Sequence, residues 1–262
     1  MYDNICKFLA ETFSSDFASW LLGEAIELTE LSSSELSLEP IRADSLILLQ
    51  SEATVLHLEF QTEPSATIPF RMLDYRVRLY RRFPSKTVRQ FVIYLQPTTS
   101  ELVQQSSFVL EETRHNFGVI RLWEQPTDLF LQSPGLLPFA TLSQTSDRTQ
   151  ALQQVAQVIE RIPNKETQQN VAASAFILAG LLLDKSIVQR LLRQDIMKES
   201  VTYQALMEEG REEGREQGRE QAQREVAIAM LQEGMEIEVI ARITKLSIEQ
   251  IQAIQSADSS QA

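Results

Sequence analysis

Two carboxylates in neighbouring β-type runs could converge and hold a metal ion. They are Asp44 and Glu59, and Gln61 shares the strand face of Glu59. Two carboxylates that converge, in a chain with few histidines and one cysteine, favour a hard divalent ion such as Mg²⁺ or Mn²⁺. Such an ion can orient an attacking water, lower the pKa of that water and neutralise charge developing on a phosphate. We therefore expect Asp44 and Glu59 as metal ligands.

The convergence of these carboxylates depends on the register of a predicted hairpin. With its turn centred between Ser51 and Glu52, Asp44 stands directly across from Glu59, and Leu46 stands across from His57. Directly opposed side chains have Cβ atoms about 5 Å apart, where like charges destabilise the pair, so a cation is expected between them. A slip of one residue would send the two carboxylates to opposite faces.

His57 shares the strand face of Glu59 because side chains alternate along a strand. Its imidazole is either an ordinary strand side chain that faces a polar neighbour or a group in contact with metal or substrate. The residues of the strand leave both interpretations open.

Hydrophobic periodicity predicts the elements that position these residues. A helix over 4–22 ends at Gly23, and a helix over 70–83 begins near Pro69. Short β-type runs are predicted at 25–31, 45–49, 54–60, 88–95 and 117–123, followed by helices near 148–162, 166–183 and 186–194. The pattern is that of an α/β fold, with a mixed sheet of about four core strands between helices and an α-helical C-terminal extension.

The predicted helix over 70–83 is strongly basic. Between positions 71 and 89 a single acid, Asp74, accompanies Arg71, Arg76, Arg78, Arg81, Arg82, Lys86 and Arg89. Arg71 and Tyr75, four residues apart on one face, would point toward the metal, while Arg78, Arg81 and Arg82 would reach a DNA backbone. The alternative is an ordinary solvated helix face.

The C-terminal quarter has two features of its own. A charged helix from about Lys198 carries a four-residue Gly-Arg-Glu repeat starting at Gly210, Gly214 and Gly218. This helix is a solvated spacer, or it pairs closely with another helix through its glycines. Residues 226–255 have the spacing of a helix-turn-helix, but the second helix contains Glu249 and no Lys or Arg. We therefore favour a packing or homo-oligomerisation module over base reading there.

Composition bounds these expectations. The 262 residues are 43% hydrophobic, enough for a core, and the net charge of −12 argues against DNA binding through overall charge, although a local basic patch remains compatible with it. The single cysteine, Cys6, excludes an intrachain disulfide and fits a reducing cytoplasm. The most apolar run, 171–183, is too short to cross a bilayer, which needs about 20 residues, so no membrane partner is expected.

The order of these elements and motifs resembles the core of the PD-(D/E)XK nuclease superfamily. The likeness is greatest to its recombination-promoting nuclease, or transposase-like, branch, especially members found in cyanobacteria. The residues that carry it are Asp3-Asn-Ile-Cys-Lys7, Arg42-Ala-Asp44, Leu58-Glu-Phe-Gln-Thr-Glu63, Phe70-Arg-Met-Leu-Asp-Tyr75 and the Gly-Arg-Glu repeats. The likeness spans nearly the whole chain.

The resemblance implies a restriction-endonuclease-like fold and a Mg²⁺- or Mn²⁺-dependent DNA endonuclease. Asp44 and Glu59 correspond to the metal ligands, and Gln61 stands where the family usually has a lysine that positions or activates water. Glutamine can still hydrogen-bond a water but brings no positive charge. An acid of the first helix often joins such sites, and here Asp3 and Glu11 are both candidates.

Three segments are expected. Residues 1–138 form the nuclease-like α/β domain, 139–197 a helical segment packed on or following it, and 198–262 the charged helix and C-terminal helical hairpin. The competing function is a catalytically inactive nuclease-fold protein that acts as an interaction or oligomerisation module. Gln61 and the acidic net charge favour this alternative, whereas the paired carboxylates and the basic helix favour the enzyme.

Overall fold

The computed structural model describes most of the N-terminal part of the chain and much of its C-terminal end. The described residues are 2–31, 46–192, 194–197, 200, 204, 208, 215, 219, 222–224, 226–231, 233 and 235–252. The chain divides into two compact units, Met1–Gln204 and Ala205–Ala262. Each unit is described by itself below.

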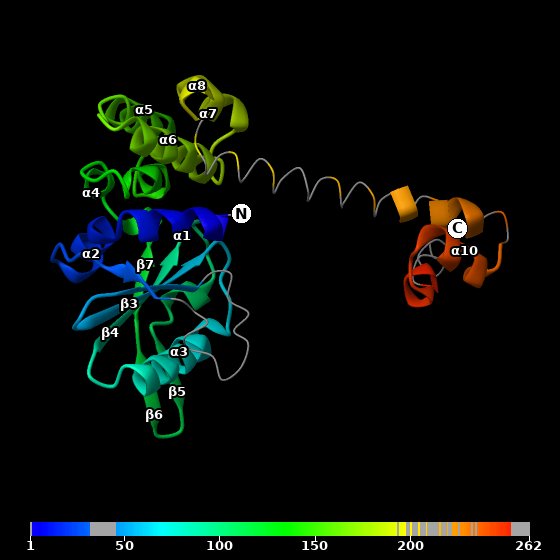
Figure 1. Cartoon of the computed structure of the whole chain (residues 1–262), viewed down its shortest axis with the longest axis horizontal. Coiled ribbons are helices and arrows are strands. Elements are labelled where there is room, and N and C mark those ends of the chain that lie inside the picture. The colour runs from blue at the N-terminus through cyan, green and yellow to red at the C-terminus, as the bar shows by residue number, and fades with distance from the viewer. Residues whose placement is uncertain are drawn as a thin grey trace. The chain divides into compact units, whose positions relative to one another are not determined.

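A five-stranded mixed sheet forms the centre of the first unit (Figure 1). Its strand order is β1-β2-β3-β4-β7, formed by Thr29–Glu30, Leu46–Gln50, Thr54–Gln61, Thr87–Tyr94 and Gly118–Arg121. Strands β1, β2 and β3 pair antiparallel, whereas β3 with β4 and β4 with β7 pair parallel. The expected α/β fold with a mixed sheet is confirmed. The fifth strand is β1, only two residues long, within the predicted run 25–31.

Alternation along β3 separates an apolar face from a polar one. Leu56, Leu58 and Phe60 are buried toward α1 (Tyr2–Thr12) and α2 (Ser14–Leu22), where the Phe60 ring meets Phe17 edge-on at a centroid distance of 6.3 Å. His57, Glu59 and Gln61 point to the other face, which α3 (Ile68–Arg82) covers. Figure 1 shows α1 and α3 on opposite sides of the sheet. Helix α3 also connects the parallel strands β3 and β4, as a crossover helix does.

The prediction of a single helix over 4–22 is wrong, because the helix breaks at Phe13 into α1 and α2. Phe13 has φ −118° and ψ 43°, outside helical values. The Ser14 hydroxyl donates to Leu28 O at 2.7 Å and accepts from Leu28 N at 3.2 Å, which fixes the start of α2 against a distant segment. The predicted stop at Gly23 is confirmed, since this residue has φ 80° and its N–H bonds Ser19 O.

The β2–β3 register differs by two residues from the predicted one. Leu48 stands across from His57 and Leu46 across from Glu59, so the turn is centred between Glu52 and Ala53. Ser51 closes this turn from both sides: its N–H donates to Thr54 O at 2.9 Å and its hydroxyl accepts from Thr54 N at 3.2 Å. A shift of two keeps every side chain on its predicted face but changes each opposed pair.

Helices after the sheet complete the apolar layer. They are α4 (Thr127–Phe130), η4 (Leu137–Leu142), α5 (Arg148–Ile159), α6 (Lys165–Ala179), α7 (Lys185–Leu191) and α8 (Gln194–Met197). The Phe139 ring of η4 stacks on Phe60 at 5.8 Å, which joins this layer to the sheet. The side chains of Asp147 and Asn164 cap α5 and α6 by accepting N–H groups of their first turns. No helix of the described residues is long and apolar enough to cross a membrane.

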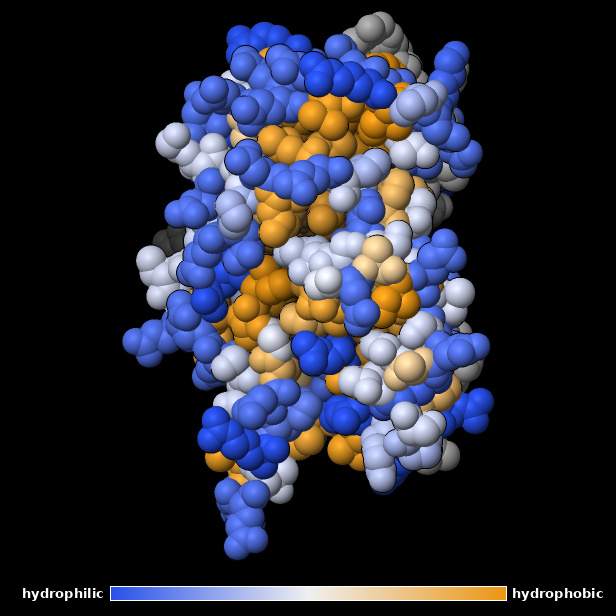
Figure 2. Space-filling view, turned by 90° about the vertical axis from the view of Figure 1, so that its left-hand side faces the viewer, coloured by the Kyte–Doolittle hydropathy of each residue, from blue (hydrophilic) through white to orange (hydrophobic). Residues whose placement is uncertain are grey.

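Four short elements between β4 and α4 were absent from the sequence prediction. They are η2 (Glu101–Gln104), β5 (Ser107–Leu110), β6 (Thr113–Asn116) and η3 (Leu122–Glu124). Strands β5 and β6 form a separate hairpin beside α3, where Phe70 meets Phe108 with ring centroids 5.6 Å apart. On the side of the molecule drawn in Figure 2, apolar groups form several separate areas bordered by hydrophilic side chains.

The second unit has a small core of its own. Ala227, Met230, Ile240 and Ile251 are buried together, and α10 (Ile237–Thr244) ends at Lys245 in the left-handed region, with φ 65°. Ser247 and Gln250 form a reciprocal capping pair at the start of the following helical residues, which confirms the predicted cap. The three repeat glycines, at 210, 214 and 218, lie outside the described residues.

Close packing at β7 predicts the first measurable effect. A Cβ at Gly118 would overlap the ring of Phe91 on the neighbouring strand. Gly118→Ala should lower the free energy of unfolding by about 1–3 kcal/mol in urea titrations. Phe91→Leu in the same chain should recover part of this loss. Equal losses from Gly118→Ala with and without Phe91→Leu would show that this contact is not the cause.

Candidate active site

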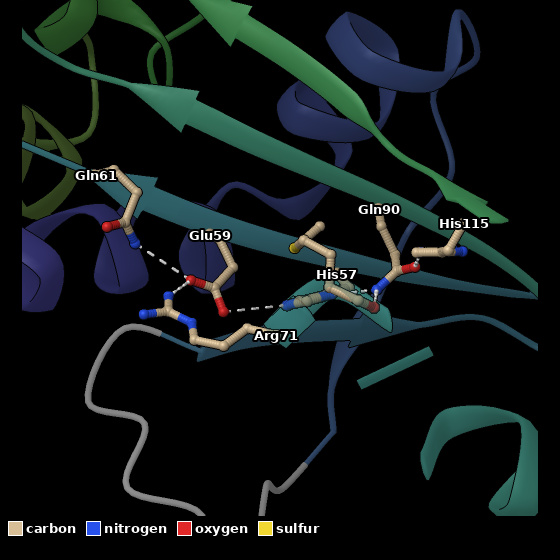
Figure 3. A network of polar contacts seen from close by, with 7 residues as sticks. His57, Glu59, Gln61, Arg71, Gln90 and His115 are labelled. Atoms are coloured by element: carbon tan, nitrogen blue, oxygen red, sulfur yellow. Dashed lines mark hydrogen bonds and ion pairs between the residues drawn. The ribbon is translucent and has the colours of Figure 1, made fainter. Parts of the chain in front are cut away.

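Glu59 is a carboxylate buried inside the sheet–α3 layer. It is 1% exposed, and its Oε2 accepts from the Gln61 amide at 3.2 Å and from the guanidinium of Arg71 (Figure 3). The Arg71 side chain comes from the first turns of α3 and is 36% exposed, so it bridges the buried carboxylate and the surface. A buried carboxylate needs such a charge partner, because desolvation without one is very costly.

The second carboxylate oxygen of Glu59 is without a hydrogen bond among the described residues. This atom, Oε1, is buried and lies 3.7 Å from Nε2 of His57, which also lacks a hydrogen-bond partner there. Lone pairs on a buried carboxylate oxygen are what a hard divalent cation binds. Glu59 therefore fits one position of the expected Mg²⁺ or Mn²⁺ set, although the described residues contain no group of three acidic, histidine or cysteine side chains that could hold an ion.

His57 is fully buried between Glu59 and an aromatic ring. Tyr75, one turn after Arg71 on α3, meets the imidazole edge-on with ring centroids 5.1 Å apart. Burial and then the negative charge of Glu59 raise the pKa of Tyr75 to about 12. Arg71 and Tyr75 thus both face the Glu59 side of the sheet, on the helix face expected for them.

A glutamine of β4 extends this network across the sheet. Gln90 stands beside His57 in the parallel β3–β4 register, and its Nε2 lies 2.9 Å from both Met72 O and His57 Nδ1. Its Oε1 accepts from Nε2 of His115, on β6, at 2.8 Å. Sequence reasoning missed Gln90 and His115. A polar residue facing α3 between Val88 and Val92 was the available signal for Gln90.

The expected acids have different outcomes. Asp44 lies outside the described residues, and the position predicted for it, across from Glu59, belongs to Leu46. Glu11 forms an ion pair with Lys7 at 3.4 Å on α1, over the opposite face of the sheet, and Asp3 lies in the first turn of the same helix. The structure does not bring either acid into a metal-binding group with Glu59 among the described residues.

The remaining arginines expected to bind DNA lie toward the end of α3. Arg78 pairs with Asp74 at 2.9 Å, whereas Arg81 and Arg82 are exposed in the last turn. The Arg82 guanidinium lies 5.9 Å from the centre of the Phe83 ring. Arg81 and Arg82 are about 15 Å from Arg71 along the helix axis. Of the arginines expected to bind DNA, Arg71 thus lies beside Glu59, whereas Arg81 and Arg82 are exposed at the end of the helix.

His115 should make stability depend on pH. Burial, followed by the charge of Arg76 and interaction with His57, lowers the pKa of His115. The unfolded chain then binds more protons just below about pH 6.5, so the free energy of unfolding should be highest above that pH and fall as the solution is acidified. His115→Gln, which keeps a donor for Gln90 but does not titrate, should flatten this dependence in urea titrations. An unchanged slope would contradict the assignment.

Comparison with known families identifies the C-terminal segment. Residues 220–256 match the family model of the Rpn/YhgA-like nuclease family, C-terminal HTH domain, in agreement with the expected helix-turn-helix spacing. Searches of curated proteins and of solved structures gave no match. Self-association through this tail, which we favoured from its sequence, stays a prediction. The match covers the C-terminal segment alone, which is thus similar to the HTH domain of that nuclease family.

Proposed function

We propose that the chain is a metal-dependent DNA endonuclease of the PD-(D/E)XK type that promotes recombination. The observation that carries this proposal is the Glu59 carboxylate, 1% exposed and with one oxygen without a hydrogen bond among the described residues. This carboxylate belongs to a chain whose C-terminal segment matches the HTH domain of a nuclease family. The substrate is DNA, bound in part by that domain.

In this proposal Asp44 and Glu59 would hold Mg²⁺ or Mn²⁺. When bound, the ion polarises the scissile phosphate and lowers the pKa of the attacking water. Gln61 has its amide nitrogen on Glu59 Oε2, so it orients the carboxylate, and its carbonyl oxygen is left to accept from the attacking water. Gln61 acts through these hydrogen bonds alone because it has no charge.

Arg71 has two anionic partners in this proposal. Before DNA binds, its guanidinium neutralises Glu59. Because a third of the side chain is exposed, Arg71 could also pair with a phosphate at the surface. A DNA phosphate would therefore give Arg71 a second anionic partner, and Glu59 would be free to serve as a ligand of the cation.

A catalytically inactive interaction module is the second candidate. The observation in its favour is that Gln61 and Arg71 both donate to Glu59 Oε2. This carboxylate oxygen is therefore satisfied without a metal. A pseudo-enzyme of this kind would keep the fold and use its C-terminal unit for binding. The two candidates differ in whether added metal produces DNA cleavage.

Nicking of supercoiled plasmid in Mg²⁺ or Mn²⁺ tests the endonuclease. The wild-type chain should nick, and Glu59→Gln, which keeps the shape and removes the charge, should slow nicking by more than about 100-fold. Loss of a ligand should exceed the 10- to 100-fold cost typical of residues that only support ligands. Asp44→Asn should have the same effect.

The control is Glu11→Gln, an acid-to-amide change on the opposite side of the sheet. It should nick at the wild-type rate, with all variants checked for folding by circular dichroism. Nicking by folded Glu59→Gln at the wild-type rate would refute the site. Absence of metal-dependent nicking in the wild-type chain would favour the inactive module.

If Arg81 and Arg82 contact DNA phosphates, DNA affinity should fall as the salt concentration rises. If each neutralises one phosphate, replacing both by Gln should reduce the slope of log K against log salt concentration by about 2. The matched control replaces Arg161 and Arg190 by Gln and so removes the same number of charges. Both residues are exposed and follow the sheet in the sequence. Equal reductions in the two double variants would mean that net charge, and not the α3 surface, sets the affinity.

A further inference from the structure

The hydrogen bonds around Gln90 fix the direction of its side-chain amide. Met72 O can only accept, so the atom 2.9 Å from it must be the amide nitrogen, and Oε1 must face Nε2 of His115 at 2.8 Å. A flipped amide would place two acceptors against each other at Met72. The backbone of α3 therefore determines which end of Gln90 faces His57.

The direction of the amide then determines the tautomer of His57. The Gln90 nitrogen has two protons, one for Met72 O and one for His57 Nδ1, each 2.9 Å away. An amide nitrogen does not accept hydrogen bonds, so Nδ1 must be the acceptor and carry no proton. In a neutral imidazole the proton is then on Nε2, the nitrogen that faces Glu59 Oε1 at 3.7 Å.

Two buried atoms without hydrogen bonds thereby become complementary. His57 Nε2 and Glu59 Oε1 both lack hydrogen-bond partners among the described residues. With the proton on Nε2, one is a donor and the other an acceptor, and an approach of about 0.8 Å would give an ordinary N–H···O bond. The same proton removes the Nε2 lone pair, so His57 is not available there as a metal ligand.

We propose that Gln90 is a positioning residue of the site: it holds His57 in the Nε2–H tautomer, which directs that N–H at Glu59 and leaves metal ligation to the carboxylate. The tautomer follows from geometry alone, whereas its effect on cleavage rests on the proposed function. A carboxylate oxygen has two lone pairs, so Oε1 can accept from His57 and still bind a cation.

Nitrogen NMR of the full-length, ¹⁵N-labelled chain tests the tautomer without any assay of activity. We expect a protonated Nε2 and an unprotonated Nδ1 on His57, with a scalar coupling across the hydrogen bond between Gln90 Nε2 and His57 Nδ1. The chain has two histidines, so the spectrum of His115→Gln assigns the signals. A proton on Nδ1, or absence of the coupling, overturns the proposal whether or not the chain is a nuclease.

Gln90→Leu tests the effect on cleavage. It keeps much of the volume and removes the donor, so the coupling should vanish and nicking should slow by about 10- to 100-fold, while the Kd for DNA stays at the wild-type value. Gln96→Leu, the same change just beyond β4, is the matched control and should keep the wild-type nicking rate. A folded Gln90→Leu chain that nicks at the wild-type rate overturns the positioning role.

The tautomer can still be decided if the variant does not fold or if the wild-type chain does not nick DNA. If Gln90→Leu does not fold, the coupling in the wild-type chain decides the proposal. If the wild-type chain does not nick DNA in either metal, the proposed function fails. The coupling then still decides the tautomer.

Discussion

The burial of the Glu59 carboxylate is the constraint on which the α3 face of the sheet depends. A charge that is 1% exposed requires a counter-charge and hydrogen-bond donors, or folding becomes very costly. Helix α3 supplies Arg71, and the strand itself supplies Gln61. Helix α3 therefore lies over the sheet where it brings Arg71 to the carboxylate that needs a counter-charge. A buried ion pair often adds no net stability, but removal of one partner leaves an uncompensated buried charge and is strongly destabilising.

The polar network continues from this carboxylate across three strands. Glu59 faces His57 on β3, His57 meets Gln90 on β4, and Gln90 meets His115 on β6. Two clusters of buried apolar side chains pack on the same face of the sheet, one with Tyr75 and Leu79 and the other with Met72 and Val92. In such surroundings each hydrogen bond is strong and each missing one is costly, so a network of this length fixes the orientation of its members.

Periodicity predicted the faces of the elements, and contacts between distant segments decided the rest. The shared face of His57, Glu59 and Gln61 follows from strand alternation, and the shared face of Arg71 and Tyr75 from helical spacing. The predicted hairpin register was wrong by two residues, because the hydroxyl of Ser51 closes a turn whose centre lies one residue later than the predicted centre. His115 gave no signal, since its place depends on a hairpin, β5–β6, that docks beside α3.

The two units contribute different parts of the proposed activity. The first holds the buried carboxylate and the arginines of α3, and the second matches an HTH domain whose core is formed by α10 and its neighbours. The helix that contains Glu249 has no Lys or Arg for phosphates, so in this proposal the α3 arginines supply cations in addition to those elsewhere in that domain. This division explains how an acidic chain could hold DNA.

Calorimetric titration of Mn²⁺ into the full-length chain tests most directly whether Glu59 is a metal ligand. The wild-type chain should bind Mn²⁺, and Glu59→Gln, folded and otherwise unchanged, should lose that binding. Equal Mn²⁺ affinity in the two chains would contradict the account, because the buried carboxylate would then have a partner in Arg71 and no role in holding a metal.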